Sequence, residues 1–260
     1  MRTGSTDGEA ADDFILVTKG LAISFGGFRA VDAVDVKVRR GTIHAIIGPN
    51  GAGKTTFFNL LTKFLAPTAG SIRFNGHDIT RSSPSSVARL GMIRSFQISA
   101  TFPQLTVLQN VRIALQSKSA GQFAFWRSNV CLGALDGRAT EILEQVGLQN
   151  FRDSLATQLS YGRQRILELA TTLATDPEVL LLDEPMAGLG HEDVDRVSSL
   201  IRRVAAGRTV VMVEHNLSVV ASLSDVITVF ARGRVLAEGS YATVSSDPRV
   251  VEAYIGTPHA

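Results

Sequence analysis

The most informative segment of this chain is Gly48-Pro49-Asn50-Gly51-Ala52-Gly53-Lys54-Thr55-Thr56. It fits the pattern G-x-x-x-x-G-K-[ST], in which a glycine-rich loop joins a strand to a helix. The nearly continuous apolar run Thr42–Ile47 predicts a buried strand before it, and residues from Lys54 to about Leu65 predict the helix. Because both flanking elements are present, the segment indicates a phosphate-binding loop rather than a chance glycine-rich turn.

Each residue type in this loop has a physical role in holding phosphate. Glycines let the backbone turn several N–H groups toward one anion, and the helix N-terminus adds partial positive charge. Lys54 brings an ammonium group to the β- and γ-phosphates, the Thr55 hydroxyl is a ligand for Mg²⁺, and Thr56 adds a polar donor. The loop therefore predicts binding of a nucleotide with Mg²⁺.

Two carboxylates, Asp183 and Glu184, follow the apolar run Val179–Leu182. Such a run predicts a central strand that ends at the edge where open α/β sheets bind ligands. We expect Asp183 to hold Mg²⁺ through a water. Glu184 points in another direction because side chains alternate along a strand, which makes it a candidate general base for the attacking water. The alternative is a solvated acidic turn.

Composition and charge argue against several classes of protein. The net charge of +2 is small and the basic residues are scattered, so no nucleic-acid partner is expected. The single cysteine, Cys131, excludes an internal disulfide, and we expect it to be passive within an irregular segment rather than catalytic. No run reaches the roughly 18 apolar residues of a membrane span. Residues 1–13 are polar, lack a signal-peptide core and are expected to be a disordered tail.

Strand signals occur on both sides of a helical middle that runs from about Gln97 to Ala170. The expected strands, besides those above, are Ile15–Val17, Val34–Val38, Ser71–Phe74 and Thr209–Val213, with Val226–Phe230 and Arg234–Ala237 as edge strands. The clearest helices are Val107–Leu115 and Ala139–Val146, whereas Ser117–Gly137 is irregular. Its aromatic cluster of Phe123, Phe125 and Trp126 is either a partner-binding patch or packing under a helix. The layout predicts an α/β core interrupted by a helical insert.

Three further motifs resemble those of the ABC transporter ATPases. Leu159-Ser160-Tyr161-Gly162-Arg163-Gln164-Arg165 resembles the signature L-S-G-G-Q, about twenty residues before the acidic strand. Ser95-Phe96-Gln97 resembles the glutamine loop, and Val213-Glu214-His215-Asn216 resembles the segment that carries the switch histidine. With the phosphate loop and the acidic strand, five motifs follow one another in the family's order.

The resemblance implies a role for each matching residue. Ser160 and Gly162, at a helix N-terminus, would reach the γ-phosphate of ATP held by a second subunit, Gln97 would sense Mg²⁺ and the attacking water, and His215 would hydrogen-bond the γ-phosphate. Phe25 would stack on adenine. The alternatives are a structural histidine for His215 and a core aromatic for Phe25.

The implied fold is an α/β P-loop NTPase with a RecA-like core, an antiparallel β subdomain and a helical signature subdomain. One ATPase domain would span residues 14–260, with 14–96 and 171–260 as core and 97–170 as the helical subdomain. Two departures, Arg163 in the signature and Gly190 in the loop after Glu184, affect the expected rate and intersubunit coupling rather than ATP binding.

Two further segments are Gly91-Met92-Ile93-Arg94-Ser95-Phe96-Gln97 and, near the C-terminus, Asp247-Pro248 with Val251-Glu252-Ala253-Tyr254-Ile255-Gly256. With the motifs above, they most resemble the ATPases of branched-chain amino acid importers and of the related urea and amide importers. That match implies a peripheral protein on the cytoplasmic face of the membrane, with permease subunits, a second cassette (a paralogue or itself) and, indirectly, a substrate-binding protein as partners. Permease docking is expected near Gln97 and Ile98–Leu108, through Phe102 and Leu105. The alternatives are a lipid or lipopolysaccharide exporter ATPase, a poorly hydrolysing regulatory cassette, and a non-transport ATPase of DNA repair or translation. The transported substrate is not encoded in these motifs.

Overall fold

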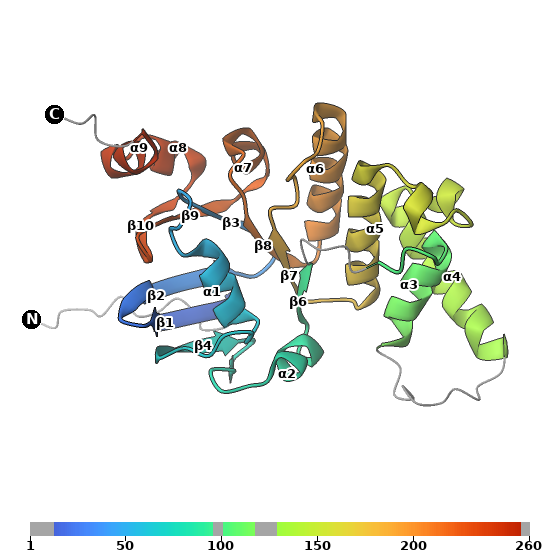
Figure 1. Cartoon of the computed structure of the whole chain (residues 1–260), viewed down its shortest axis with the longest axis horizontal. Coiled ribbons are helices and arrows are strands. Elements are labelled where there is room, and N and C mark those ends of the chain that lie inside the picture. Colours follow the sequence, from blue (N-terminus) through green and yellow to red (C-terminus); the bar gives the residue numbers. More distant parts are fainter. Residues whose placement is uncertain (1–12, 96–100, 118–128, 256–260) are drawn as a thin grey trace, which may run out of the picture. The chain divides into compact units, whose positions relative to one another are not determined.

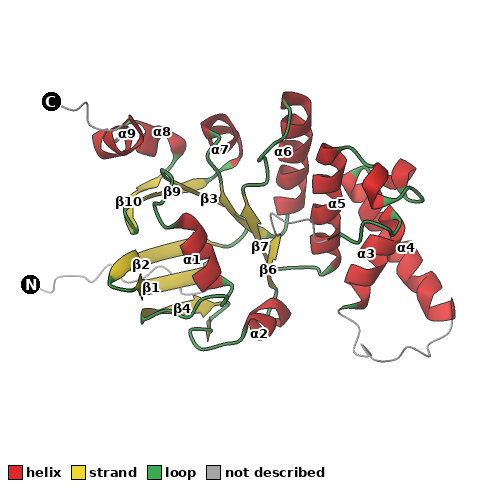
Figure 2. Ribbon diagram, viewed as in Figure 1, coloured by secondary structure: helices red, strands yellow, loops and turns green. Residues whose placement is uncertain are grey.

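The computed structural model describes residues 13–95, 101–117 and 129–255, and it divides into two compact units. Unit 1 consists of Met1–Leu90 and Ala205–Ala260, and unit 2 of Gly91–Val204. Strands predominate in unit 1 and helices in unit 2 (Figures 1 and 2). The expected tail lies outside the described residues except for Asp13, and the domain boundaries expected from the sequence remain predictions.

One sheet of unit 1 is antiparallel. Its strands, in the order β2-β1-β4-β5, are β1 (Phe14–Phe25), β2 (Phe28–Arg39), β4 (Ala69–Phe74) and β5 (His77–Asp78). Gly26 and Gly27 both have positive φ and form the turn between β1 and β2. Buried and exposed residues alternate from Val34 to Arg39, because one face of the sheet covers the core. The expected antiparallel strands are confirmed as parts of longer ones.

The other strands of unit 1 surround β3. They are β3 (Ile43–Ile47), β8 (Thr209–Val213), β9 (Val226–Ala231) and β10 (Arg234–Gly239). β3 pairs in parallel with both β8 and β9, and every residue of β3 and β8 is buried, as expected for continuous apolar runs. The prediction that β9 is an edge strand is wrong, because it pairs with β3 on one side and β10 on the other.

The described helices of unit 1 are short. They are α1 (Lys54–Leu61), α2 (Pro84–Arg89), α7 (Leu217–Leu223), α8 (Tyr241–Ser245) and α9 (Pro248–Ile255). α1 ends at Leu61 and not at about Leu65, because Lys63 has a φ of 64°, which a right-handed helix does not contain.

Unit 2 contains a parallel strand pair, β6 (Met92–Ser95) and β7 (Val179–Asp183). Its helices are α3 (Val107–Gln116), α4 (Asn129–Val146), α5 (Tyr161–Ala174) and α6 (His191–Ala205, whose last residue falls in unit 1), with 3₁₀ turns at Gln149–Phe151 and Ala156–Gln158. α4 already begins at Asn129, so the irregular segment predicted to Gly137 is too long, and Cys131 lies in a helix. The aromatic cluster lies outside the described residues. No helix in the described ranges has the length and apolar character needed to span a bilayer.

Candidate functional site

The phosphate loop follows β3 and has the backbone of an anion cradle. Gly48, Gly51 and Gly53 all have positive φ, at 150°, 77° and 101°. A Cβ at Gly48 would lie 2.2 Å from the carbonyl oxygen of Phe230, and one at Gly53 would lie 2.4 Å from that of Ala30. Both conformation and space therefore require glycine at these two positions.

Lys54 lies within this loop and is only 8% exposed. Its ammonium group donates to the carbonyl oxygens of Gly48 (2.7 Å) and Pro49 (3.0 Å), so the side chain folds back over the loop. α1 starts after Gly53, no side chain caps its N-terminus, and no acidic residue lies in its first turn. Backbone N–H groups, the helix dipole and a buried cation are thus gathered in one loop, which suits a polyphosphate.

The remaining residues of the loop differ in exposure. Thr55, the predicted Mg²⁺ ligand, is exposed, and Thr56 is half-buried. Asn50 is exposed, whereas Ala52 is buried. Tyr254 of α9 is 37% exposed and places its hydroxyl near the Gly48 backbone, and partial burial raises the pKa of this tyrosine to about 12.

Phe25 and His215, the other predicted site residues of unit 1, both lie at the ends of strands. Phe25 is 47% exposed, so it is not the core aromatic of the alternative interpretation. His215 is exposed and lies two residues after the end of β8. The residue before it, Glu214, is fully buried and accepts hydrogen bonds from the backbone N–H groups of His215 (3.1 Å) and Asn216 (3.4 Å). Glu214 thus fixes the turn that carries His215, a role that the sequence signals only by placing a carboxylate at the end of an apolar strand.

In unit 2, Asp183 ends β7 and is 4% exposed. Its carboxylate forms an ion pair with Arg94 of β6. No local pattern points to Arg94, because its pairing with Asp183, 89 positions away, depends on the register of two strands. Glu184 is half-buried and has a φ of 49°, a conformation that costs a non-glycine residue energy and that clusters at functional sites. Gln97 lies outside the described residues.

Ser160 is the N-cap residue of α5 and is exposed, as expected, but its side chain caps no N–H group. Gly162 is buried, and a Cβ there would lie 2.2 Å from the carboxyl carbon of Asp193. Its backbone is helical, so glycine is needed here for space and not for an unusual backbone conformation. Arg163 lies with its guanidinium 4.3 Å from the centre of the Phe151 ring.

Comparison with known proteins gives a consistent result. The family model described as ABC transporter matches residues 31–187, and the one described as Branched-chain amino acid ATP-binding cassette transporter matches residues 234–260. The chain is 39% identical to the high-affinity branched-chain amino acid transport ATP-binding protein BraF of Pseudomonas aeruginosa, over 93% of this chain and 98% of that protein.

Solved structures agree with the sequence comparison. A nucleotide-free ATP-binding cassette from an ABC transporter is similar with a TM-score of 0.83 and 32% identity, covering 94% of this chain and 99% of that one. A dimeric bacterial ABC transporter cassette is similar with a TM-score of 0.73 and 26% identity, covering 87% and 98%. These similarities confirm the predicted α/β P-loop fold.

Proposed function

Since the chain belongs to the ABC transporter family, whose ATP-binding domains bind and hydrolyse ATP, we propose that it powers import of branched-chain or other amino acids through separate permease subunits. The observation that carries the proposal is the loop Gly48–Thr56, with two sterically required glycines and a buried Lys54. The C-terminal match at residues 234–260 and the similarity to BraF, a branched-chain amino acid transport protein, support amino acids as the substrate class.

The phosphate loop binds the polyphosphate of ATP. N–H groups of the loop and the N-terminus of α1 hold the phosphate oxygens, and the Lys54 ammonium balances their charge. Phe25 stacks on adenine, which its exposure allows. Thr55, Gln97 and Asp183 would hold Mg²⁺, which would supply charge neutralisation when bound.

Three residues serve hydrolysis in this proposal. Glu184 accepts a proton from the attacking water, and its unfavourable φ of 49° is consistent with a side chain aimed by the fold rather than by local preference. His215 hydrogen-bonds the γ-phosphate from a turn that Glu214 fixes. Gln97 orients the water.

A second cassette, either a paralogue or another copy, completes each ATP site with its Ser160 and Gly162 turn. The dimeric structure of a similar bacterial cassette supports this arrangement. ATP favours the closed pair because its γ-phosphate bridges both halves, and a ligand shifts such an equilibrium only by binding one state better.

The permease partners would dock on the turn before α3. Phe102 is 51% exposed there, although the turn around it is firmly built. The buried Asn110 side chain accepts from the Phe102 N–H (2.6 Å) and donates to the carbonyl oxygens of Phe102 (3.1 Å) and Thr106 (2.9 Å). An exposed aromatic on a rigid turn suits a cytoplasmic helix of a permease, which would place the protein on the cytoplasmic face of the membrane.

Reconstitution with its permeases and binding protein in vesicles tests the proposal. We expect ATP-dependent uptake of labelled leucine, which Glu184→Gln abolishes while leaving ATP binding intact. Phe102→Asp should keep basal ATP hydrolysis but lose uptake. ATP hydrolysis without uptake of any amino acid would contradict the importer assignment, and equal hydrolysis by wild type and Glu184→Gln would contradict the role of Glu184.

A further inference from the structure

The β9–β10 turn, Arg232-Gly233, is hydrogen-bonded to the phosphate loop. The Gly233 N–H donates to the Ala52 carbonyl oxygen (2.9 Å), and the Gly233 carbonyl oxygen accepts from the Asp32 N–H (2.8 Å). Gly233 is buried, has a φ of 78°, and would bring a Cβ to 2.9 Å from the carbonyl oxygen of Ala30. This single residue therefore connects β2 to the phosphate loop.

The bond to Ala52 determines which way the next N–H points. In a trans peptide the C=O and the following N–H point in opposite directions, and no cis peptide occurs in the described residues. Because the Ala52 carbonyl is directed at Gly233, the Gly53 N–H is directed away from the turn. Gly53 is the last loop residue before α1, so its N–H is one of the donors that an anion in the loop would use.

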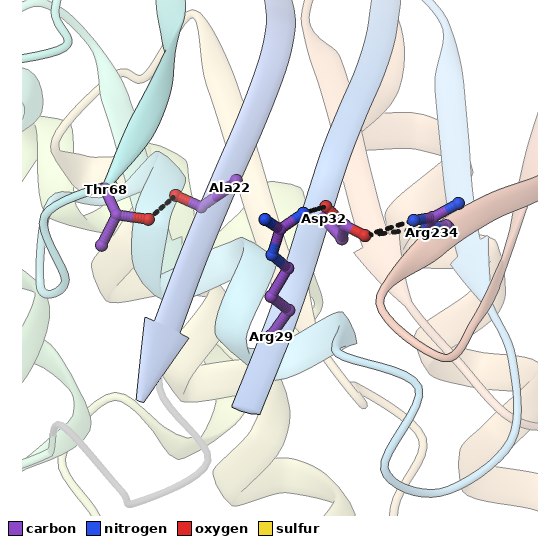
Figure 3. A network of polar contacts seen from close by, with 5 residues as sticks. All are labelled: Ala22, Arg29, Asp32, Thr68 and Arg234. Carbon is purple, nitrogen blue, oxygen red and sulfur yellow. Dashed lines mark hydrogen bonds and ion pairs between the residues drawn. The ribbon is translucent and has the colours of Figure 1, made fainter. Parts of the chain in front are cut away.

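Asp32 fixes the other side of this turn (Figure 3). Arg234 donates to its Oδ2 through Nε (2.9 Å) and one terminal nitrogen (2.6 Å), while Arg29 donates to Oδ1 (2.8 Å). The Asp32 side chain is 11% exposed, and hydrogen bonds from Arg234 and Arg29 hold its pKa below the usual value. Arg234 is the first residue of β10, so its bidentate contact ties the end of the turn to β2.

We infer that Asp32 and Arg234 are positioning residues that set the phosphate loop through Gly233, an inference that rests on the proposed function. Surface ion pairs contribute little to stability as a rule, and the Arg234 side chain is 70% exposed. The pair instead holds the β9–β10 turn in position. Asp32 binds Arg234, the neighbouring Gly233 is hydrogen-bonded to Ala52, and the turn thereby links Asp32 to the phosphate loop. A shift of the turn would rotate the peptide between Ala52 and Gly53 and misdirect one phosphate donor.

Arg29 provides the matched control. It contacts the same carboxylate and is nearly as exposed as Arg234, at 66% against 70%, but its ion pair joins two residues of β2 rather than β2 and the first residue of β10. Arg234→Gln should therefore weaken Mg-ATP binding about tenfold, whereas Arg29→Gln leaves it unchanged. Arg234→Lys, which keeps the charge but not the bidentate contact, should fall between them.

Titration calorimetry with Mg-ATP, paired with urea denaturation, separates the outcomes. We expect Arg234→Gln to lose affinity with an unchanged unfolding midpoint, and the double variant Asp32→Asn, Arg234→Gln to lose no more than Arg234→Gln alone. Equal affinities for Arg234→Gln and Arg29→Gln, or a loss that follows the unfolding midpoint, would overturn the inference. If wild type and Lys54→Ala bind Mg-ATP equally, it is the proposed function that fails.

Discussion

The two glycine-containing turns assigned to ATP, the phosphate loop of unit 1 and the signature turn of unit 2, are built on different physical principles. In the phosphate loop, Gly48 and Gly53 have positive φ and face backbone carbonyl oxygens that cannot move away. In the signature turn, Gly162 is helical and faces the carboxylate of Asp193, a side chain that can move. The same residue type therefore satisfies a backbone requirement in one turn and a packing requirement in the other, and the two should respond differently to added methyl groups.

The largest effect is expected from Gly53→Ala. Its methyl group would lie 2.4 Å from the Ala30 carbonyl oxygen at a φ of 101°, so the loop must distort. We expect a loss of about 3 kcal/mol in the free energy of unfolding and a fall of at least about 100-fold in ATP affinity. Gly51→Ala is the matched control, because its φ of 77° is also positive but nothing lies within 4 Å. Gly51→Ala should cost about 1 kcal/mol. If urea denaturation gives both variants the same cost, the close approach to the Ala30 carbonyl oxygen does not explain why position 53 requires glycine.

The strand that leads into the phosphate loop contains a buried histidine that should make stability depend on pH. His44 of β3 is fully buried beside the Thr228 hydroxyl (2.7 Å), and burial lowers its pKa to about 4. The unfolded chain protonates this imidazole near pH 6.5, whereas the folded chain keeps it neutral until about pH 4. Between these values the unfolded state binds more protons, so stability falls as the pH falls, by up to about 3 kcal/mol.

His44→Gln keeps a donor for Thr228 but does not titrate, so it should flatten the decline between pH 6.5 and 4 in denaturation midpoints. His77→Gln, at an exposed position in β5, should leave the wild-type profile unchanged. Parallel profiles for wild type and His44→Gln would show that this buried imidazole does not make unit 1 acid-sensitive.

The signature glycine should give a smaller effect whose sign depends on its neighbour. Gly162→Ala adds a methyl group against Asp193, which we expect to cost about 1 kcal/mol. In an Asp193→Ala background the obstacle is gone, and alanine in a helix is favoured over glycine by about 1 kcal/mol, so the same change should stabilise. An identical cost in both backgrounds would indicate that Gly162 is required by its backbone, as the phosphate-loop glycines are.

Features that depend on neighbouring residues were predictable from the sequence, whereas contacts between residues far apart in the chain were not. The loop Gly48–Thr56 and the run Val179–Leu182 were recognisable because their chemistry and flanking patterns are local. The reason for Gly162 depends on Asp193, 31 positions further along the chain, and the contact between Asp32 and Arg234 spans 202 positions. No periodicity encodes such pairs, since they follow from strand order and register. The sequence could have indicated that β9 lies inside the sheet and not at its edge, because a continuous apolar run favours burial on both faces.

The last effect, no larger than the cost of Gly162→Ala, concerns Glu184, a residue of unit 2 that has a positive φ although it is not glycine. Replacing it with glycine relieves the backbone, whereas glutamine retains the strain, and both remove the proposed base. We expect Glu184→Gly to exceed Glu184→Gln by about 1 kcal/mol in the free energy of unfolding, although both lose hydrolysis. Urea denaturation of the two variants without nucleotide measures the difference directly. If Glu184→Gln is at least as stable as Glu184→Gly, the φ of 49° carries no strain, and the backbone at this carboxylate is set by local preference rather than by its catalytic role.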